Sequence, residues 1–380
     1  MTNDQTAPVE QRMRARDLGT AIGRIPTGPW NAITDVPGVA VGHTTLIAGD
    51  GPLVAGHGPV RTGVTVVLPR AEDVGADPCF AGSHVLNGNG EMTGLAWVEE
   101  SGLLTTPVAI TNTHSVGVVR DALISYEVAR RAGPAEPFWS LPVVAETYDG
   151  FLNDINGMHV RPEHVAAALD GARDGPVAEG CVGGGTGMIC HGFKGGIGTA
   201  SRVLPAADGG WTVGVLVQAN YGSRPLLRVD GVPVGELIGA DIVPLPRRGA
   251  AEAGSIIVVI ATDAPLLPTQ CRRLAQRATI GIARMGGLGA NSSGDLFLAV
   301  STANRGLEER PAPGGTLTAR FLPNDATTPL FQAVVEATEE SILNALCMAT
   351  TLTGIDGNTA YALPLDHFTQ IMREWRSGRA

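Results

Sequence analysis

The feature that most constrains this chain of 380 residues is a buried-strand pattern that begins on a hydroxyl residue. The run from Ser255 to Ile260 reads Ser-Ile-Ile-Val-Val-Ile, and consecutive β-branched apolar residues are typical of a strand inside a sheet. The polar and proline-bearing stretch 221–254 precedes it and predicts an exposed, cleavable loop. Because the strand is too apolar to lie outside a shared sheet, residue 255 is a candidate chain boundary and not a domain boundary.

The step from Gly254 to Ser255 permits a specific chemistry at the start of this strand. Glycine has no Cβ, so a hydroxyl can reach its carbonyl carbon, and its backbone tolerates a strained turn. Cleavage of the bond would leave the Ser255 hydroxyl beside its own α-amine, whose ordinary pKa of roughly 8 suits a general base. Glycine and serine are also common turn residues, so on local sequence alone a turn explains the step adequately.

Composition restricts the class of protein. Hydrophobic residues make up 44% of the chain, which indicates a globular protein, and the 51 glycines and 26 prolines predict many turns. The net charge of −10, without a block of lysine and arginine, argues against nucleic-acid binding. The first 16 residues lack the apolar segment of a secretory signal, and no run of about 18 apolar residues occurs. We therefore expect a cytoplasmic protein without a membrane partner.

The cysteines and histidines do not form a metal-binding or disulfide pattern. The five cysteines are odd in number and include no C-x-x-C pair, and the eight histidines include no H-E-x-x-H. These residues are best interpreted as core or surface residues. The sequence therefore predicts neither a metal nor a cofactor.

Hydrophobic periodicity and turn residues predict alternating strands and helices without an internal repeat. Residues 1–30 are polar and predict an arm, and the Gly/Pro-rich segment 50–60 predicts a loop. Strands are expected within 36–43 (after a turn), 63–69, 140–144, 211–219, 255–261 and 296–300. Helices are expected over 113–131, 163–169, 268–282, 328–346 and 364–375, four of them with a proline at or near the start.

The densest glycine segment, 180–202, resembles nucleotide-binding loops but does not satisfy their patterns. Within 183–188 the third glycine of G-x-G-x-x-G is replaced by Met188 or Cys190, depending on the register. A P-loop fails as well, because Lys194 is followed by Gly195 where serine or threonine is required. We expect instead a loop that packs closely against another element or lines a pocket with bare N–H groups.

Thr113-His114-Ser115-Val116-Gly117 resembles the nucleophile elbow of α/β-hydrolases, with Thr113 in place of the first glycine. That replacement would strain the elbow. A helix N-cap by Thr113 or Ser115 explains these residues adequately.

Polar residues also stand beside three predicted strands. Ser293 and Asp295 lie in a turn-like segment, 291–295, and could alternatively form a hydroxyl–carboxylate relay that orients a nucleophile and moves its proton. Asn220 follows one strand and is suited to donate to an oxyanion. Glu146 follows another and is suited to hold a substrate ammonium. These two assignments rest on position at a strand end.

Seven segments together resemble the L-aminopeptidase/D-alanine-esterase-amidase family, which includes the β-aminopeptidases. They occur in the family's order and extend over nearly the whole chain. The matching segments are 31–39 (Asn-Ala-Ile-Thr-Asp-Val-Pro-Gly-Val), 111–115, 146–150 (Glu-Thr-Tyr-Asp-Gly), the glycine-rich 183–198, 218–222 (Gln-Ala-Asn-Tyr-Gly), 254–257 (Gly-Ser-Ile-Ile) and 292–295 (Ser-Ser-Gly-Asp).

The resemblance implies a self-processing serine hydrolase with an N-terminal nucleophile and a four-layer α-β-β-α sandwich of the α/β (α+β) class. It implies one precursor cut into an α chain, 1–254, and a β chain, 255–380, that form one compact domain, and an oligomer of such pairs. It also implies roles for six residues. Ser255 would be the nucleophile, with Ser293 and Asp295 as its supporting pair. Asn220 would be the oxyanion donor, Tyr148 a neighbour of the reacting carbonyl and Glu146 the anchor for the substrate amine. The family's β-peptide-cleaving members carry glutamate where this chain has Asp295, which leaves β-peptide cleavage open.

We therefore expect an aminopeptidase that releases N-terminal residues from short peptides and also cleaves small amino-acid amides and esters. An ornithine acetyltransferase-like acyl transferase is an alternative, although those proteins cut at Ala-Thr. A non-catalytic nucleotide or small-ligand binder that uses the glycine-rich loop is a second alternative. The enzyme would show fragments 1–254 and 255–380 by mass, whereas a binding protein would show one intact chain.

Overall fold

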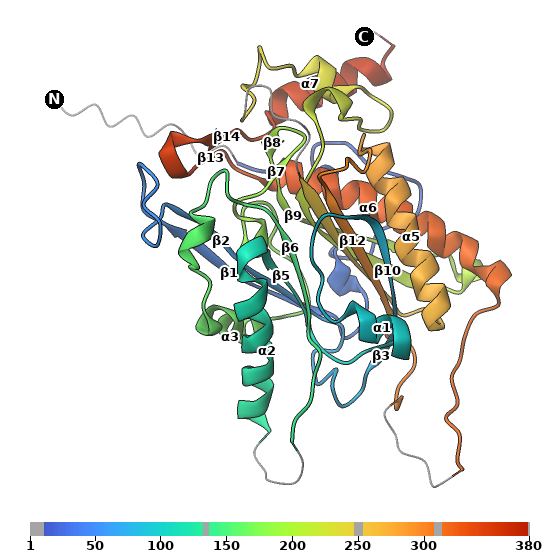
Figure 1. Cartoon of the computed structure of the whole chain (residues 1–380). Coiled ribbons are helices and arrows are strands. Elements are labelled where there is room, and N and C mark those ends of the chain that lie inside the picture. Colours follow the sequence, from blue (N-terminus) through green and yellow to red (C-terminus); the bar gives the residue numbers. More distant parts are fainter. Residues whose placement is uncertain (1–10, 132–136, 247–253, 308–313, 379–380) are drawn as a thin grey trace.

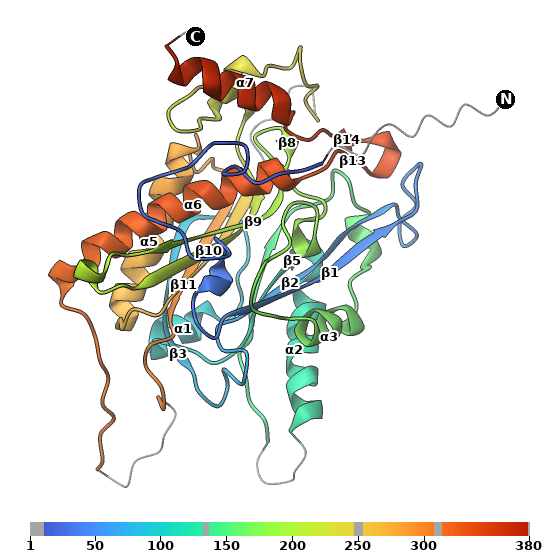
Figure 2. The same cartoon turned by 180° about the vertical axis from the view of Figure 1, so that it is seen from behind.

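The computed structural model describes residues 11–131, 137–246, 254–307 and 314–378, and it contains two large facing sheets (Figures 1 and 2). The six-stranded sheet has the order β4 (Leu103–Leu104), β3 (Cys79–Gly88), β12 (Gly294–Ser301), β11 (Ser255–Thr262), β10 (Thr212–Asn220), β9 (Gly196–Val203). The four-stranded sheet has the order β1 (Ala40–Ala48), β2 (Val60–Leu68), β5 (Val108–Asn112), β6 (Val143–Thr147). Two small hairpins pair β7 (Ile189–Cys190) with β8 (Phe193–Lys194) and β13 (Leu352–Thr353) with β14 (Thr359–Ala360).

Helices cover the outer face of each large sheet. Helices α5 (Pro268–Arg284) and α6 (Thr328–Met348) pack on the six-stranded sheet, and α2 (Val116–Arg130) and α3 (Pro162–Asp170) pack on the four-stranded sheet (Figure 1). The remaining helices are α1 (Leu95–Ser101), α4 (Val234–Leu237) and α7 (Leu365–Arg376). The four layers confirm the predicted α-β-β-α sandwich. No helix of the described segments is long and apolar enough to cross a membrane.

Three separate apolar clusters fill the three spaces between the four layers. Strand β11 contributes to two of them, because successive side chains of a strand point to opposite faces. Ile256, Val258 and Ile260 pack under the helices, whereas Ile257 and Val259 face the four-stranded sheet. Burial on both faces explains the unbroken apolar run. Ser255 has the same parity as Ile257 and therefore faces the four-stranded sheet.

Several predictions of elements are confirmed, since the strand from residue 255 and the helices near Pro268, Pro329 and Pro364 are present. The glycine-rich segment 180–202, for which no strand was predicted, forms strand β9 at its C-terminal end. Glycine is required there because a Cβ on Gly198 would lie 1.9 Å from a carbonyl oxygen of α6. Strands β3 and β5 lie in segments for which no strand was predicted.

The prediction of an exposed loop over 221–254 is also wrong for much of its length. Leu227, Val229, Val232 and Ile238 are fully or almost fully buried and join the cluster beneath the helices. These apolar residues alternate with polar and proline residues, so the segment reads as polar although its side chains divide between core and surface. The candidate loop's last part, 247–253, lies outside the described residues.

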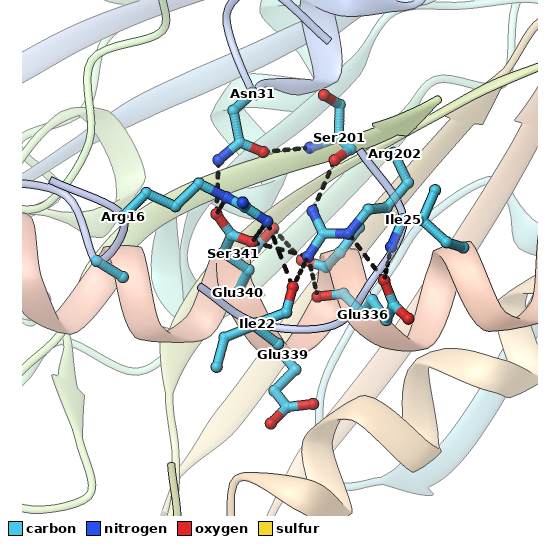
Figure 3. Close-up of polar contacts among 12 residues, drawn as sticks. Arg16, Ile22, Ile25, Asn31, Ser201, Arg202, Glu336, Glu339, Glu340 and Ser341 are labelled. Atoms are coloured by element: carbon cyan, nitrogen blue, oxygen red, sulfur yellow. Dashed lines mark hydrogen bonds and ion pairs between the residues drawn. The ribbon is translucent and has the colours of Figure 1, made fainter. Parts of the chain in front are cut away.

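The predicted N-terminal arm packs along α6 over its described residues. Arg16 pairs with Glu340 at 2.7 Å, and Arg202 of β9 pairs with Glu340 at 2.7 Å and with Glu336 at 3.2 Å (Figure 3). The side chains of Arg202 and Glu340 are completely buried. Asn31 also donates to Glu340 at 2.6 Å. This network joins segments before residue 254 to a helix that follows residue 255.

We predict that Glu340→Gln lowers the free energy of unfolding by about 3–5 kcal/mol, because it leaves the buried Arg202 guanidinium with an incomplete set of partners. Glu236→Gln is the matched control, since Glu236 pairs with Arg228 at 2.6 Å but is 56% exposed. It should cost less than about 1 kcal/mol. Urea denaturation at one protein concentration measures both. Equal losses would contradict a special role for the buried network.

Candidate active site

The predicted nucleophile lies at the end of the central strand. Ser255 is the first residue of β11, is 6% exposed, and stands opposite Asn220 of β10 and Gly294 of β12 in the strand register. Its Oγ accepts a hydrogen bond from the Gly294 N–H at 3.1 Å. The hydroxyl is therefore held by a backbone donor at the point where two ladders end.

Gly254 fits a site that no larger residue could occupy without a shift. A Cβ at this position would lie 2.2 Å from the Asn220 carbonyl oxygen and 2.8 Å from the Cα of Tyr221. The backbone before Ser255 therefore lies flush against the end of β10. This close approach gives a structural requirement for glycine, in addition to the chemical argument made from the sequence.

Ser293 and Asp295 are brought together beside Ser255. The Ser293 hydroxyl donates to Asp295 Oδ1 at 2.6 Å, and the two residues flank Gly294. Burial raises the pKa of the Asp295 carboxyl, and the Ser293 hydroxyl and the Ile256 backbone N–H lower it in part. Asp295 shares the helix-facing parity of Phe297, so it approaches the strand end from the face opposite to the Ser255 side chain.

Two asparagines at the end of β3, which the sequence analysis did not identify, hold the turn that carries Ser293. Asn87 Nδ2 donates to the Ala290 carbonyl, and Asn89 Nδ2 donates to the Ser292 carbonyl at 2.7 Å. The Asn89 N–H donates to the Ser293 carbonyl at 3.2 Å. In the sequence these asparagines stand in Asn-Gly-Asn-Gly, which signals only a turn.

The Asn220 carboxamide has a defined orientation. Its Oδ1 accepts from the Ile189 backbone N–H at 2.8 Å, and its Nδ2 donates to the Tyr148 carbonyl at 2.9 Å. A backbone N–H can only donate, so it fixes which end of the amide carries the oxygen. Asn220 has the same parity as Gln218, which donates to Thr111 and Thr147 of the four-stranded sheet. Ser255 and Asn220 therefore face the same space between the sheets.

Glu146 occupies the end of β6 on the opposite wall. Its carboxylate accepts from the Thr113 hydroxyl and from the Glu91 N–H, the latter at 3.0 Å. Burial raises the pKa of the Glu146 carboxyl, and these two hydrogen bonds lower it in part. A Cβ on Gly90 would lie 3.2 Å from Glu146 Oε1 and 3.0 Å from the Cα of Gly294. Gly90 thus lies between this carboxylate and Gly294 of β12, whose N–H binds the Ser255 hydroxyl.

Tyr148 is placed differently from the other candidates. Its side chain is 48% exposed and lies over Gly150, where a Cβ would be 2.4 Å from the phenol oxygen. Its backbone carbonyl is the part that reaches Asn220. Tyr148 is therefore beside the site, with its phenol turned toward the surface.

Ser115 is the N-cap residue of α2, as predicted, but its hydroxyl makes no capping hydrogen bond. Asn112 is the cap of the short 3-10 turn Thr113–Ser115, since its Oδ1 accepts from the Ser115 N–H at 3.0 Å. The Thr113 hydroxyl is engaged by Glu146 instead, a role that the sequence analysis missed. Ser115 is 2% exposed. No cluster of three metal-binding side chains occurs among the described residues.

The family of this chain is shown by its similarity to known proteins. Residues 31–360 match the family model of Peptidase family S58. The chain is 52% identical over 373 residues to the beta-peptidyl aminopeptidase BapA of Sphingosinicella microcystinivorans, which covers 96% of this chain and 92% of that protein.

Two solved structures are similar over nearly their whole length. A beta-aminopeptidase of Burkholderia sp. has a TM-score of 0.86 and 55% identity, with 95% of this chain and 99% of that chain covered. The L-aminopeptidase D-Ala-esterase/amidase of Ochrobactrum anthropi, described as a prototype serine aminopeptidase and a variant of the Ntn hydrolase fold, has a TM-score of 0.86 and 44% identity, with 96% and 99% covered. The four layers are thus those of the Ntn (N-terminal nucleophile) hydrolase fold. This chain belongs to Peptidase family S58 and is an aminopeptidase.

Asp149, which follows Tyr148, is a further buried acid near the site. Its carboxyl lies among Thr62, Asn112 and Asn153, and its Oδ2 is buried without a hydrogen-bond partner in the described part of the chain. Burial raises the pKa of Asp149 to about 7, and the hydrogen bonds from Thr62, Asn153 and Asn112 lower it in part. The carboxyl thus holds its proton in the folded protein at pH values where it ionises in the unfolded chain.

We predict that the raised pKa of Asp149 makes the free energy of unfolding fall as pH rises. Between pH 4 and 7 the folded protein binds more protons at Asp149 than the unfolded chain, at roughly 1.4 kcal/mol per pH unit. Asp149→Asn, which mimics the neutral acid, removes this loss, so its melting temperature relative to the wild type should rise from pH 5 to pH 7 and then level. Burial also raises the pKa of Glu179 to about 7, but Glu179 is present in both proteins, so its contribution cancels in the comparison. A difference independent of pH would contradict the prediction.

Proposed function

We propose that this aminopeptidase cuts its own chain between Gly254 and Ser255 and uses the freed Ser255 as its nucleophile. The observation that carries the proposal is the register at the strand end, where Ser255 stands between Asn220 and Gly294 and its Oγ accepts from the Gly294 N–H. The flush packing of Gly254 and the adjacent Ser293–Asp295 hydrogen bond support it.

The first reaction is an N-to-O acyl shift. The Ser255 Oγ attacks the Gly254 carbonyl carbon, the peptide C–N bond breaks, and the hydroxyl proton passes to the departing nitrogen. The resulting ester is hydrolysed by water, which gives a carboxylate on Gly254 and an α-amine on Ser255. The products are the fragments 1–254 and 255–380.

The two fragments would remain one compact domain after the cut. Strand β11 begins the second fragment and is hydrogen-bonded on one side to β10 of the first. Strand β12 is likewise paired with β3. The buried pairs of Arg16 and Arg202 with Glu340 also join the two fragments (Figure 3). Assembly of such pairs into an oligomer rests on family resemblance, and light scattering of the purified protein tests it.

The second reaction is hydrolysis of an N-terminal residue from a short peptide. The α-amine of Ser255, with an ordinary pKa of roughly 8, takes the hydroxyl proton with help from Ser293 and Asp295 while Oγ bonds to the substrate carbonyl carbon. The peptide C–N bond then breaks, and the proton passes to the departing amine. Water hydrolyses the resulting ester, which releases the N-terminal residue and restores the Ser255 hydroxyl. Asn220 and backbone N–H groups stabilise the oxyanion, and Tyr148 neighbours the reacting carbonyl. The buried Glu146 carboxylate, which lies near Gly90, holds the substrate ammonium.

We predict that Ser255→Ala purifies as one uncut chain without peptidase activity, because both reactions use this hydroxyl. Wild-type protein should give two masses, and N-terminal sequencing of the smaller fragment should read Ser-Ile-Ile-Val. Ser301→Ala is the matched control, since Ser301 is a buried serine on β12 whose hydroxyl donates to the Ala264 carbonyl at 2.6 Å. It should be cut and active. An active, uncut Ser255→Ala protein would remove the mechanism.

A second question is which N-terminal residue the site accepts. The names of the relatives from Sphingosinicella and Burkholderia favour an N-terminal β-amino acid, whereas the name of the relative from Ochrobactrum favours L-residues and D-alanine amides and esters. Glu146 recognises only the ammonium, so all three classes are compatible with it.

We predict that p-nitroanilides of β-homoalanine and L-alanine and the amide of D-alanine are cleaved at rates that differ by more than tenfold, while N-acetylated forms are not cleaved. Acetylation removes the ammonium that Glu146 would bind, so the acetylated forms should not be cleaved. Release of p-nitroaniline or ammonia measures the rates. Equal cleavage of the acetylated compounds would contradict the amine anchor.

A further inference from the structure

Lys194 is the single lysine of the chain, and the other 26 of its 27 lysine and arginine residues are arginine. It is completely buried. Lysine is among the residues least often buried, because an ammonium loses its hydration there. A chain that uses arginine everywhere else and keeps its one lysine in the interior points to a requirement for a compact ammonium at this position.

Three backbone carbonyls accept hydrogen bonds from the Lys194 ammonium. Its Nζ lies 2.8 Å from the Met188 oxygen, 2.9 Å from the Gly195 oxygen and 3.4 Å from the Gly185 oxygen. Three carbonyl acceptors match the three donors of an ammonium, whereas a neutral amine has only two N–H bonds. Within the described segments, no hydrogen bond or ion pair joins Lys194 to a carboxylate.

The ionisable groups near Lys194 are two cysteines. Burial lowers the pKa of the Lys194 ammonium, and the thiols of Cys181 and Cys190 raise it in part. Burial also raises the pKa of Cys190 to about 12, so that thiol stays neutral. Cys190 is therefore not a counterion for the ammonium, which three carbonyl dipoles face directly.

One of these dipoles leads directly to the candidate oxyanion donor. The Met188 carbonyl that accepts from Lys194 belongs to the same peptide unit as the Ile189 N–H. That N–H donates to Asn220 Oδ1 at 2.8 Å. Lys194, one peptide and one carboxamide thus form a continuous chain of hydrogen bonds that reaches Asn220 Nδ2, one of whose two N–H bonds donates to the Tyr148 carbonyl. Gly195 N–H also donates to the Met188 carbonyl, at 2.9 Å, and fixes the same peptide.

We propose that Lys194 is a positioning residue that orients and polarises the Asn220 carboxamide through the Met188–Ile189 peptide, and so strengthens Asn220 as the oxyanion donor.

The physical basis is the cooperativity of hydrogen-bond chains in a low-dielectric interior. A cation at one end of such a chain increases the dipole of each link, so the last N–H becomes a better donor. The benefit grows when negative charge develops on the substrate oxygen, because preorganised dipoles then act on a full charge. Lys194 does not touch the reacting atoms. The proposal rests on the proposed function, in which Asn220 serves the oxyanion.

The test is a double-mutant cycle on kcat with Lys194→Met and Asn220→Ala. Asn220→Ala should lower kcat roughly a hundredfold. Lys194→Met alone should lower kcat about tenfold with little change in KM. In the Asn220→Ala background, Lys194→Met should change kcat less than about twofold, because its effect passes through the missing carboxamide. Equal factors in both backgrounds would overturn the proposal.

Arg224→Met is the matched control. The Arg224 guanidinium is also buried and also binds backbone carbonyls, those of His191, Gly192, Ile238 and Val243. It makes no contact with the Met188–Ile189 peptide in these hydrogen bonds. Its effect on kcat should therefore multiply with that of Asn220→Ala. A non-additive Arg224→Met would show that any buried cation in this region gives the same coupling, and would overturn the proposal.

A measurement without the lysine variant covers the case in which Lys194→Met does not fold. Because the chain has one lysine, lysine labelled with 15N at Nζ gives a single ammonium resonance. A dipeptide aldehyde that adds to Ser255 should shift this resonance in the wild type and leave it within the linewidth in Asn220→Ala. No shift in the wild type, or the same shift in both proteins, would overturn the proposal.

The outcomes also separate this inference from the proposed function. If Ser255→Ala is uncut and inactive while the two effects multiply, the function stands and the role of Lys194 fails. If Ser255→Ala remains active, the function and the role of Lys194 both fail.

Discussion

The structure depends on the pairing of β11 with β10 and β12 at the centre of the six-stranded sheet. Both faces of β11 are covered, one by the helices and one by the four-stranded sheet, so the strand has no exposed side toward which it could relax. Its register is fixed by backbone ladders on both edges, and both ladders end at Ser255. The position of the hydroxyl is thus set by a strand that is held on both edges and both faces, which suits a group that must meet a carbonyl carbon within a fraction of an ångström. The loops around it only need to bring their polar groups to this fixed point.

Local patterns were enough to predict the elements that carry their own signals. Proline at the start of α5, α6 and α7 marks helix beginnings, and the β-branched run marks β11, because these signals act within a few residues. Strand β9 was missed for a different reason. Its glycines reflect contact with α6, since a Cβ on Gly198 would collide with the Ser341 carbonyl oxygen. A glycine needed by a partner 143 positions away looks, in the sequence, like a glycine of a loop. The segment that follows β10 was predicted to be exposed because its prolines and arginines interrupt the apolar positions that the structure buries.

The same distinction between local signals and contacts distant in sequence applies to the site residues. Ser255, Ser293, Asp295, Asn220 and Glu146 could be named because the family resemblance supplied them, and the structure brings them to one end of the two sheets. Their roles remain predictions. The residues that the sequence did not indicate act on backbone carbonyls or across long separations. Asn89 donates to a carbonyl 203 residues later, and Thr113 reaches Glu146 from the 3-10 turn that follows β5. A donor to a carbonyl has no characteristic spacing, because every residue offers the same acceptor. In the sequence, Lys194 appears only within a partial P-loop pattern, which fails because Gly195 follows it.

The distribution of buried charge around Ser255 is consistent with the reaction that we propose. Two carboxyl groups, Asp295 and Glu146, are close to where amines would stand, and burial raises the pKa of each. An amine arriving beside either group relieves that penalty by supplying the missing positive charge. On the oxyanion side the charged group is the Lys194 ammonium. It is separated from the reacting atoms by the Met188–Ile189 peptide and the Asn220 carboxamide. A cation in direct contact would bind the carboxylate of a product or inhibitor as well as the transition state. Neutral dipoles polarised by a cation favour the transition state more selectively, because they respond most to charge concentrated on a single oxygen.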